Sequence, residues 1–213
     1  MGETRQGNTR RCIDIPDRQK VKVGVVGSAG GDLPEEIMDT CRELGREIGR
    51  RGCVIVTGAC PGMPHAAVLG AREEGGMTIG ISPALCLEEH RTRYKSPYLE
   101  YDALIFTGSG LMGREVVVVR TSDIIITVGG RSGTLGEFAI AYDDGNVVGA
   151  LLGTGGITDH LEHIVGLIEK DTGTEMFYSR DPVELMDLTL ASHERRVHEG
   201  RAYLINEAGT FWR

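Results

Sequence analysis

The sequence lacks the features that mark membrane-spanning, secreted or nucleic-acid-binding proteins. It has no apolar run approaching the roughly 18 residues that a membrane span requires. Residues 1–20 are polar and have no apolar core, so we expect no secretory signal there. The net charge is −8, with 23 Lys and Arg against 31 Asp and Glu. Since nucleic-acid-binding proteins are usually basic, we expect no nucleic-acid partner and no membrane partner.

The way the chain uses cysteine, lysine and histidine excludes several chemistries. The five cysteines include no C-x-x-C pair, so we expect reduced, buried thiols in a cytoplasmic protein. None of the four lysines lies in a glycine-rich turn, which argues against a lysine-bound cofactor such as pyridoxal phosphate. The six histidines have no spacing typical of metal ligands. We therefore expect neither a metal nor a resident cofactor.

No standard nucleotide-binding motif occurs. The first turn has Gly24, Gly27 and Gly30 at a spacing of three, which is not the G-x-G-x-x-G pattern. No acidic residue follows the second predicted strand at Thr57 to hold a ribose. The P-loop pattern G-x-x-x-x-G-K-[ST] is also missing. These absences argue against a standard NAD, FAD or P-loop site.

What the chain does contain is a regular alternation of apolar strands and helical patterns. This alternation, beginning with a strand at 21–27, predicts an α/β fold: a doubly wound, Rossmann-like parallel sheet in a single three-layer domain. We divide the chain into a flexible N-terminal arm (1–20), a Rossmann-like nucleotide-binding domain (21–170) and a C-terminal helix with a small hairpin (171–213). Residues 82–100 are predicted to be irregular and form a candidate lid or interface loop.

The most informative stretch is 123–137, which reads DIIITVGGRSGTLGE. The apolar run Ile124–Val128 predicts a strand that is covered on both faces. The glycines after it permit positive φ and close approach to a ligand, and free N–H groups at the start of the next helix favour an anion. In a doubly wound sheet the ligand lies beyond the carboxyl ends of the strands. Glycine-containing turns follow four predicted strands, at 27–31, 58–62, 108–113 and 129–133.

Arg114 and Glu137 are the predicted catalytic residues. Each follows one of these strands, and we expect neighbouring strands to bring them close together. A guanidinium offers a fork of donors to a phosphate, a ribose or a leaving base. A carboxylate can activate water or stabilise positive charge on a sugar ring. Each residue alone fits a structural salt bridge, but the two together beside an anion site favour a functional role.

The run from Arg114 to Glu137 resembles the LOG family of nucleoside 5′-monophosphate phosphoribohydrolases. That family has an Arg-Lys pair, then a strand, then P-G-G-x-G-T-x-x-E. Without gaps, Gly130, Gly133, Thr134 and Glu137 match this motif. The resemblance covers about 21–170. The other landmarks of the family match at Val26-Gly27-Ser28, at Gly58, at Pro61-Gly62-Met63, and at Gly75-Gly76 before a strand that ends in Pro83.

Three departures from the motif resemble a sister branch of the same superfamily, which includes proteins similar to molybdenum-cofactor carriers and many members of unknown role. Gly129 stands where the motif has Pro, and Arg131 stands where it has its second Gly. Glu115 replaces the Lys of the Arg-Lys pair. Arg131 either adds a contact to phosphate or narrows the site and abolishes hydrolysis.

The resemblance implies hydrolysis of a nucleoside monophosphate. Its phosphate would bind Ser28 and the amides of 130–134, while Arg114 and Glu137 would flank the N-glycosidic bond. Glu137 would help water attack the ribose carbon, and the products would be a free base and ribose 5-phosphate. The expected phosphate- or ligand-binding residues are Ser28, Gly58, Gly62, Gly129, Gly130, Arg131, Ser132, Gly133 and Thr134.

Two alternatives remain open at this point. The first is a non-catalytic carrier or sensor of a phosphorylated ligand, such as molybdenum cofactor or a nucleotide, and the pair Arg131 and Glu115 favours it. The second is a structural oligomer with a vestigial site. Members of the LOG family are usually dimers, so the resemblance also implies a homo-oligomer. The partner expected in the first alternative, as in hydrolysis, is a nucleotide or another phosphorylated small molecule.

Overall fold

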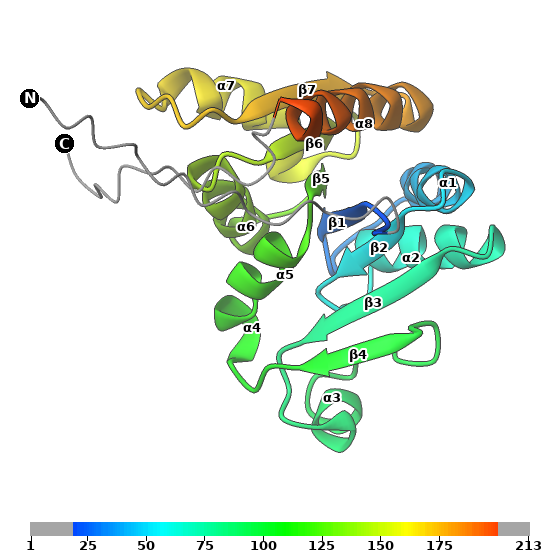
Figure 1. The fold of residues 1–213 in the computed structure, drawn as a ribbon. Helices are drawn as coiled ribbons and strands as arrows, with labels where there is room; N and C mark the ends of the chain where they lie inside the picture. The colour runs from blue at the N-terminus through cyan, green and yellow to red at the C-terminus, as the bar shows by residue number, and fades with distance from the viewer. Residues whose placement is uncertain (1–18, 200–213) are drawn as a thin grey trace, which may run out of the picture.

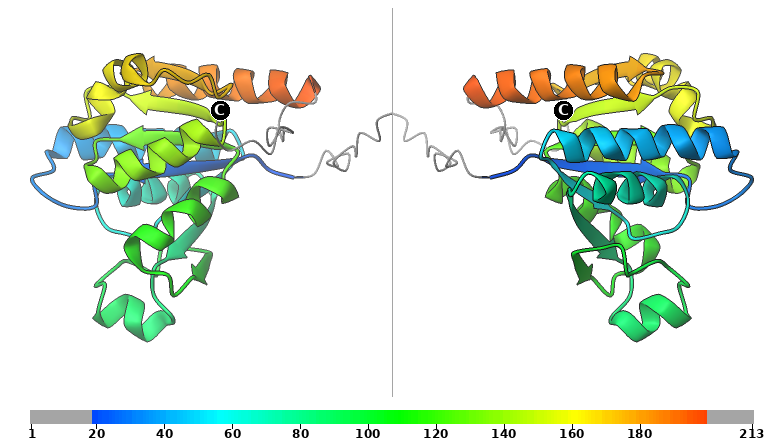
Figure 2. Two further views of the ribbon diagram at one scale, coloured as in Figure 1. Left: turned by 90° about the vertical axis from the view of Figure 1, so that its left-hand side faces the viewer. Right: turned by 90° about the vertical axis from the view of Figure 1, so that its right-hand side faces the viewer.

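The computed structural model describes residues 19–199, and within them strands and helices alternate along the chain. Nearly all of the predicted N-terminal arm and the predicted terminal hairpin lie outside the described residues. Seven strands form one sheet, and helices cover both of its faces (Figure 1; Figure 2). The predicted three-layer, doubly wound α/β fold is confirmed.

The bounds of the elements follow the predicted alternation. The strands are β1 (Lys22–Gly27), β2 (Val54–Thr57), β3 (Met77–Ser82), β4 (Ala103–Phe106), β5 (Ile124–Val128), β6 (Val147–Leu151) and β7 (Glu175–Ser179). The helices are α1 (Glu35–Arg50), α2 (Met63–Glu73), α3 (Leu87–Thr92), α4 (Gly110–Gly113), α5 (Glu115–Thr121), α6 (Ser132–Asp143), the 3-10 helix η1 (Gly156–His160), α7 (Leu161–Leu167) and α8 (Pro182–His198).

The strand order β4-β3-β2-β1-β5-β6-β7 determines where a ligand site can form. From β1 the chain winds outward through β2 and β3 to β4, and it then crosses back to β5 beside β1. All neighbouring strands are parallel, and Gly27 at the end of β1 pairs with Val128 at the end of β5. The winding direction therefore switches between β1 and β5. In such sheets the crevice beyond the strand ends at the switch point is the usual ligand site.

The sheet separates two hydrophobic cores, because side chains alternate between the faces of each strand. On one face α1, α2 and α8 pack against residues that include Ile124 and Ile126 of β5. On the other face α5, α6 and α7 pack against residues that include Ile125. All three isoleucines are completely buried. The predicted burial of β5 on both faces is therefore confirmed, and it makes this strand a rigid base for the turn that follows it.

Several local expectations need correction. Residues 82–100 are not wholly irregular, because they contain the short helix α3. Among the described cysteines, all free, Cys41 and Cys53 are buried, whereas Cys60 is partly buried and Cys86 is exposed. The two less buried thiols lie in connections that leave strand ends, where less of the protein covers them. No described helix has the length and apolar character to cross a membrane.

Helices α1 and α2 pack together closely because glycines face the partner backbone. A Cβ atom at Gly45 would lie 1.8 Å from the carbonyl oxygen of Ala67. A Cβ atom at Gly70 of α2 would lie 1.9 Å from the carbonyl oxygen of Arg42 on α1. Neither position can accept a side chain without separating the two helices.

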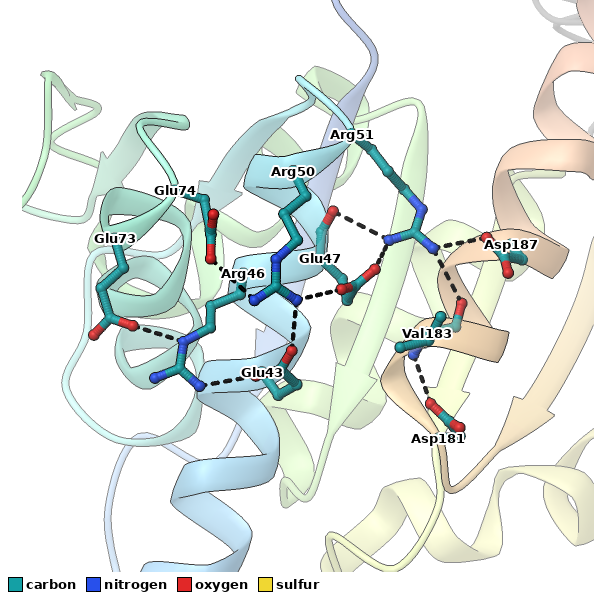
Figure 3. Close-up of polar contacts among 10 residues, drawn as sticks. All are labelled: Glu43, Arg46, Glu47, Arg50, Arg51, Glu73, Glu74, Asp181, Val183 and Asp187. Atoms are coloured by element: carbon teal, nitrogen blue, oxygen red, sulfur yellow. Dashed lines mark hydrogen bonds and ion pairs between the residues drawn. The ribbon is translucent and has the colours of Figure 1, made fainter.

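Charged side chains connect α1 to its neighbours around this contact (Figure 3). Arg46 donates to Glu43 on its own helix at 2.8 Å and to Glu73 of α2 at 2.7 Å. Arg51, just after α1, pairs with Glu47 and reaches Asp187 of α8 at 2.7 Å. The more exposed of these pairs, those of Arg46 and the pair of Arg51 with Asp187, each contribute roughly 0–1 kcal/mol. The network therefore aligns the three helices, while the buried apolar contacts stabilise them.

The contact between α1 and α2 gives a direct test of the fold. Gly45→Ala should destabilise the protein by about 1–3 kcal/mol, because the new methyl group overlaps backbone atoms. Gly166→Ala is the matched control, since this exposed glycine of α7 has open space around it and should gain about 0.5–1 kcal/mol of stability. Urea unfolding followed by circular dichroism measures both changes. Equal stability of Gly45→Ala and wild type would contradict the packing described.

Candidate functional site

The turns that follow β1 and β5 are joined at the switch point. The amide of Gly130 donates to Ser28 Oγ at 2.7 Å, and the amide of Ser28 donates to the carbonyl of Val128 at 3.0 Å. The amide of Gly129 donates to Thr154 Oγ1 at 2.8 Å. The structure thus brings Ser28, Gly129 and Gly130 together, and the protein itself occupies the amides of the two glycines.

Gly130 needs to be glycine for two reasons. Its φ is +97°, which side chains rarely adopt, and a Cβ atom there would lie 2.3 Å from Thr134 Oγ1. The resulting sharp turn lets the chain leave β5 and enter α6 within a few residues. The start of α6 is therefore held close above the ends of β1 and β5.

The first turn of α6 supplies the free donors of the site. Among the described residues, no acceptor contacts the amides of Arg131, Ser132, Gly133 or Thr134. The first amide to find a partner is that of Leu135, which donates to the carbonyl of Arg131 at 2.9 Å. The positive end of the helix dipole adds to these four donors. We call the four amides of 131–134 the cradle, and an anion is the group that they favour.

Arg131 extends from the cradle across the switch point. Its Nη2 atom donates to the carbonyl of Gly30, in the turn after β1, at 2.6 Å. The residue is exposed, so the guanidinium lies at the edge of the cradle with donors left over. It therefore places a positive charge beside the cradle.

Arg114 and Glu137 form a buried ion pair. Arg114 Nη1 donates to Glu137 Oε1 at 2.7 Å, and the side chains are 11% and 7% exposed. Arg114 Nη2 contacts the sulfur of Cys60 at 3.5 Å. Arg114 Nε is buried and has no partner in the part of the chain that the structure describes. The Nε–H group of Arg114 is thus a donor without an acceptor, near the site.

From the sequence we expected neighbouring strands to bring Arg114 and Glu137 together, and this reason was wrong. Arg114 follows β4, which is an edge strand, and three strands lie between β4 and β5. The two residues meet because α4 and α5 return from the edge toward the switch point and carry Arg114 with them (Figure 1). The crossover that the strand order requires, rather than strand pairing, therefore builds this pair.

Gly58 and Gly62 make room for other groups. A Cβ atom at Gly58 would lie 2.1 Å from the guanidinium carbon of Arg114, so the missing side chain creates the space for that group. Gly62 has φ +89°, and a Cβ atom there would lie 2.3 Å from the carbonyl oxygen of Ser28. The next amide, that of Met63, donates to this same carbonyl at 2.9 Å. Gly58 thus leaves room for the guanidinium group of Arg114, and Gly62 leaves room for the backbone of Ser28.

The surroundings tune the acidity of Glu137. Burial raises its pKa to about 7, although Arg114 acts in the opposite direction. Glu115 adds to the increase because its charge has the same sign. A carboxyl group that titrates near neutral pH beside a guanidinium can take up or release a proton during a reaction. No group of three or more metal-ligating side chains occurs in the described ranges.

Sequence reasoning missed several contributors. Cys60 contacts the guanidinium group of Arg114, and its place in the glycine-containing turn 58–62 was an available signal. Thr154 holds the turn after β5 in place, as does Thr158, whose Oγ1 donates to the carbonyl of Gly129 at 2.6 Å. Their location in the connection after β6 became meaningful only once β6 was placed beside β5.

Comparisons with known proteins identify the family of this chain. Residues 20–186 match the SLOG cluster4 family. An uncharacterised protein of Archaeoglobus fulgidus is 33% identical over 132 residues, which are 62% of this chain and 80% of that protein. The structure of a molybdenum cofactor binding protein from the phototrophic bacterium Rippkaea orientalis is similar, with 26% identity and a TM-score of 0.68, over 82% of this chain and 98% of that one. The molybdenum cofactor carrier protein of Chlamydomonas reinhardtii is also similar, with 26% identity and a TM-score of 0.67, over 83% and 99% of the two chains.

A more distant likeness extends to the fold alone. DNA processing protein A from Helicobacter pylori, described with a single-stranded DNA binding mode, is 17% identical, with a TM-score of 0.54 over 82% of this chain and 81% of that one. The family match, in contrast, covers most of the described residues. The predicted relationship to LOG-like proteins, on the branch similar to molybdenum-cofactor carriers, is confirmed, and the protein belongs to the SLOG cluster4 family.

Proposed function

We propose that this protein binds a phosphorylated small molecule at the cradle and acts as its carrier or sensor, with a pterin or nucleotide of the molybdenum-cofactor kind as the ligand. The observation that carries the proposal is the set of four free amides at 131–134, with the guanidinium of Arg131 at their edge. The likeness to a molybdenum cofactor binding protein and to a molybdenum cofactor carrier supports it.

The state of Glu137 favours a carrier over a hydrolase. A general base has to accept a proton from water, whereas Glu137 accepts an N–H from Arg114 and is only 7% exposed. The charge of Glu137 is therefore balanced by Arg114. In this arrangement the binding of the ligand is left to the amides and Arg131.

A binding experiment tests this function. AMP and isolated molybdenum cofactor should raise the melting temperature of the protein, while adenosine should not, because only phosphorylated ligands engage the cradle. Arg131→Gln should weaken binding of AMP about tenfold, as expected for the loss of about 1.4 kcal/mol. Arg93→Gln is the matched control, because Arg93 is also exposed but directly follows α3, away from the cradle. A shift with adenosine as large as that with AMP would contradict the proposal.

Hydrolysis of a nucleoside monophosphate is the second candidate function. One observation favours it: Glu137 has a pKa raised to about 7 and lies within 2.7 Å of a guanidinium group. Entry of a ligand that draws Arg114 toward itself would release this carboxyl group. It could then act on water at the ribose carbon.

Release of adenine from AMP distinguishes the two functions. The carrier proposal predicts none. Hydrolysis predicts release at a rate that rises with pH through about 7, because a general base must be ionised and Glu137 loses its proton there. Glu137→Gln would then lower the rate by roughly 10²-fold or more with the fold intact. Chromatography of AMP incubated with each protein between pH 5.5 and 8.5 measures the outcome.

We also propose that the protein forms a homo-oligomer through an apolar surface around α3, β4, α4 and α5. Large exposed apolar patches on soluble proteins mark interaction sites. Parallel strands are usually covered on both faces, whereas the last two residues of β4 are exposed. The exposed apolar residues on and next to these elements are Leu85, Leu87, Leu99, Ile105, Phe106, Leu111, Met112, Val116 and Val117.

The oligomer proposal has a matched pair of variants. Met112→Glu places a charge on this surface and should convert the protein to a monomer, with the circular dichroism spectrum of the folded wild type. Leu167→Glu is the control, since Leu167 is equally exposed at 67% but ends α7. Light scattering after size-exclusion chromatography gives the mass of each variant. A monomeric wild type would overturn the proposal.

A further inference from the structure

A second carboxyl group lies against the first turn of α6. Glu115 begins α5 and is only 5% exposed. Its Oε1 lies 3.4 Å from the position of a Cβ atom at Gly133, which is part of the cradle, and its Oε2 lies 2.6 Å from such an atom at Gly136. Glycine at both positions provides the room for this carboxyl group, which therefore lies directly beside the cradle.

Glu115 has no partner among the described residues. The adjacent Arg114 turns away from it and pairs with Glu137. Within the range 19–199, no Lys, Arg or His lies within ion-pair distance of this carboxyl group, and no N–H or O–H group donates to it. Burial accordingly raises its pKa, and Arg114 acts in the opposite direction. Its two oxygens are not among the fully buried side-chain atoms that lack a partner within this range, so solvent or a ligand can reach them.

Favourable interaction with the dipole of α6 is a structural explanation, but it fits only in part. A carboxylate that serves a helix N-terminus usually accepts hydrogen bonds from first-turn amides, as a capping side chain does. Glu115 accepts none, and the amides of 131–134 stay free. The carboxyl group thus adds a negative charge at the cradle without occupying it.

Two positive and two negative side chains therefore lie around the cradle. On the α4–α5 side are Arg114 and Glu115, and on α6 and the turn before it are Glu137 and Arg131. Above about pH 7, where Glu137 is ionised, Arg114 and Glu137 neutralise each other, so Arg131 and Glu115 decide the local charge. Each negative charge on a bound phosphoryl group is attracted by Arg131 and the amides and repelled by Glu115. A doubly charged group meets both the attraction and the repulsion twice. Because Glu115 offsets Arg131, the second charge gains little at the cradle, although it adds to the cost of removing the group from water.

We propose that Glu115 is a specificity-determining residue that makes the cradle select phosphoryl groups carrying one negative charge. The ligand class is then a phosphodiester, or a diphosphate esterified at both ends, of a nucleotide or pterin, in preference to a terminal phosphate monoester, which carries nearly two charges above pH 7. The inference rests on the proposed function, because it requires an anion at the cradle, and it narrows the ligand of that site.

Two probes that differ by one methyl group and one charge test this selection. AMP and its 5′-phosphate methyl ester share the base and the ribose, and at pH 8 they carry two charges and one charge on the phosphoryl group. The wild type should bind the methyl ester at least as tightly as AMP, as measured by calorimetry. Glu115→Gln is isosteric and should bind AMP roughly tenfold more tightly and the ester roughly threefold more tightly, since the gain grows with each charge.

Glu88→Gln, at an exposed position of α3, is the control and should leave both affinities unchanged. Equal gains for AMP and the ester in Glu115→Gln, or a loss of affinity for either, would overturn the role of Glu115. A lower melting temperature with unchanged affinities would also overturn it, because it would leave only the dipole role. Binding of neither probe by wild type and Glu115→Gln would instead refute the anion site itself, so the two failures can be told apart.

Discussion

The parallel pairing of β1 with β5 is the constraint on which the rest of this structure depends. It aligns the ends of the two strands, so the turn after β1 and the turn after β5 meet and share hydrogen bonds. That contact holds the start of α6 above the sheet with its first amides free. It also forces the chain to return from the far edge of the sheet, and this return delivers Arg114 to the same place. One pairing thus assembles groups from distant parts of the sequence.

The sequence predicted the features that depend on local pattern. The apolar run Ile124–Val128 and the glycines after it were enough to predict a buried strand and a free helix terminus, because burial, backbone freedom and unpaired amides follow from neighbouring residues. The alternation of elements was enough to predict the layers. The resemblance of the motif between 114 and 137 to LOG-like proteins then led to the family that the comparisons support.

Features that depend on the direction of a side chain could not be predicted from the sequence pattern. Gly130 belongs to the motif, but only the three-dimensional turn shows that its amide is used by Ser28. Glu115 was visible as a departure from the motif, yet its position against α6 results from the angle between two helices. The proximity of Arg114 and Glu137 was predicted correctly, but for the wrong reason. The prediction made the strands before them neighbours, whereas three strands lie between β4 and β5 and the crossover carries Arg114 back.

The close contact between Gly58 and the side chain of Arg114 has a consequence for homologues of this chain. The guanidinium group of Arg114 occupies the volume that any side chain at 58 would need. A chain that acquires even alanine there must expel the arginine, strand Glu137 as an unpaired buried charge, or lose both. Glycine at 58 and arginine at 114 should therefore be inherited as a unit, and a homologue in which one has changed without the other has abandoned this ion pair.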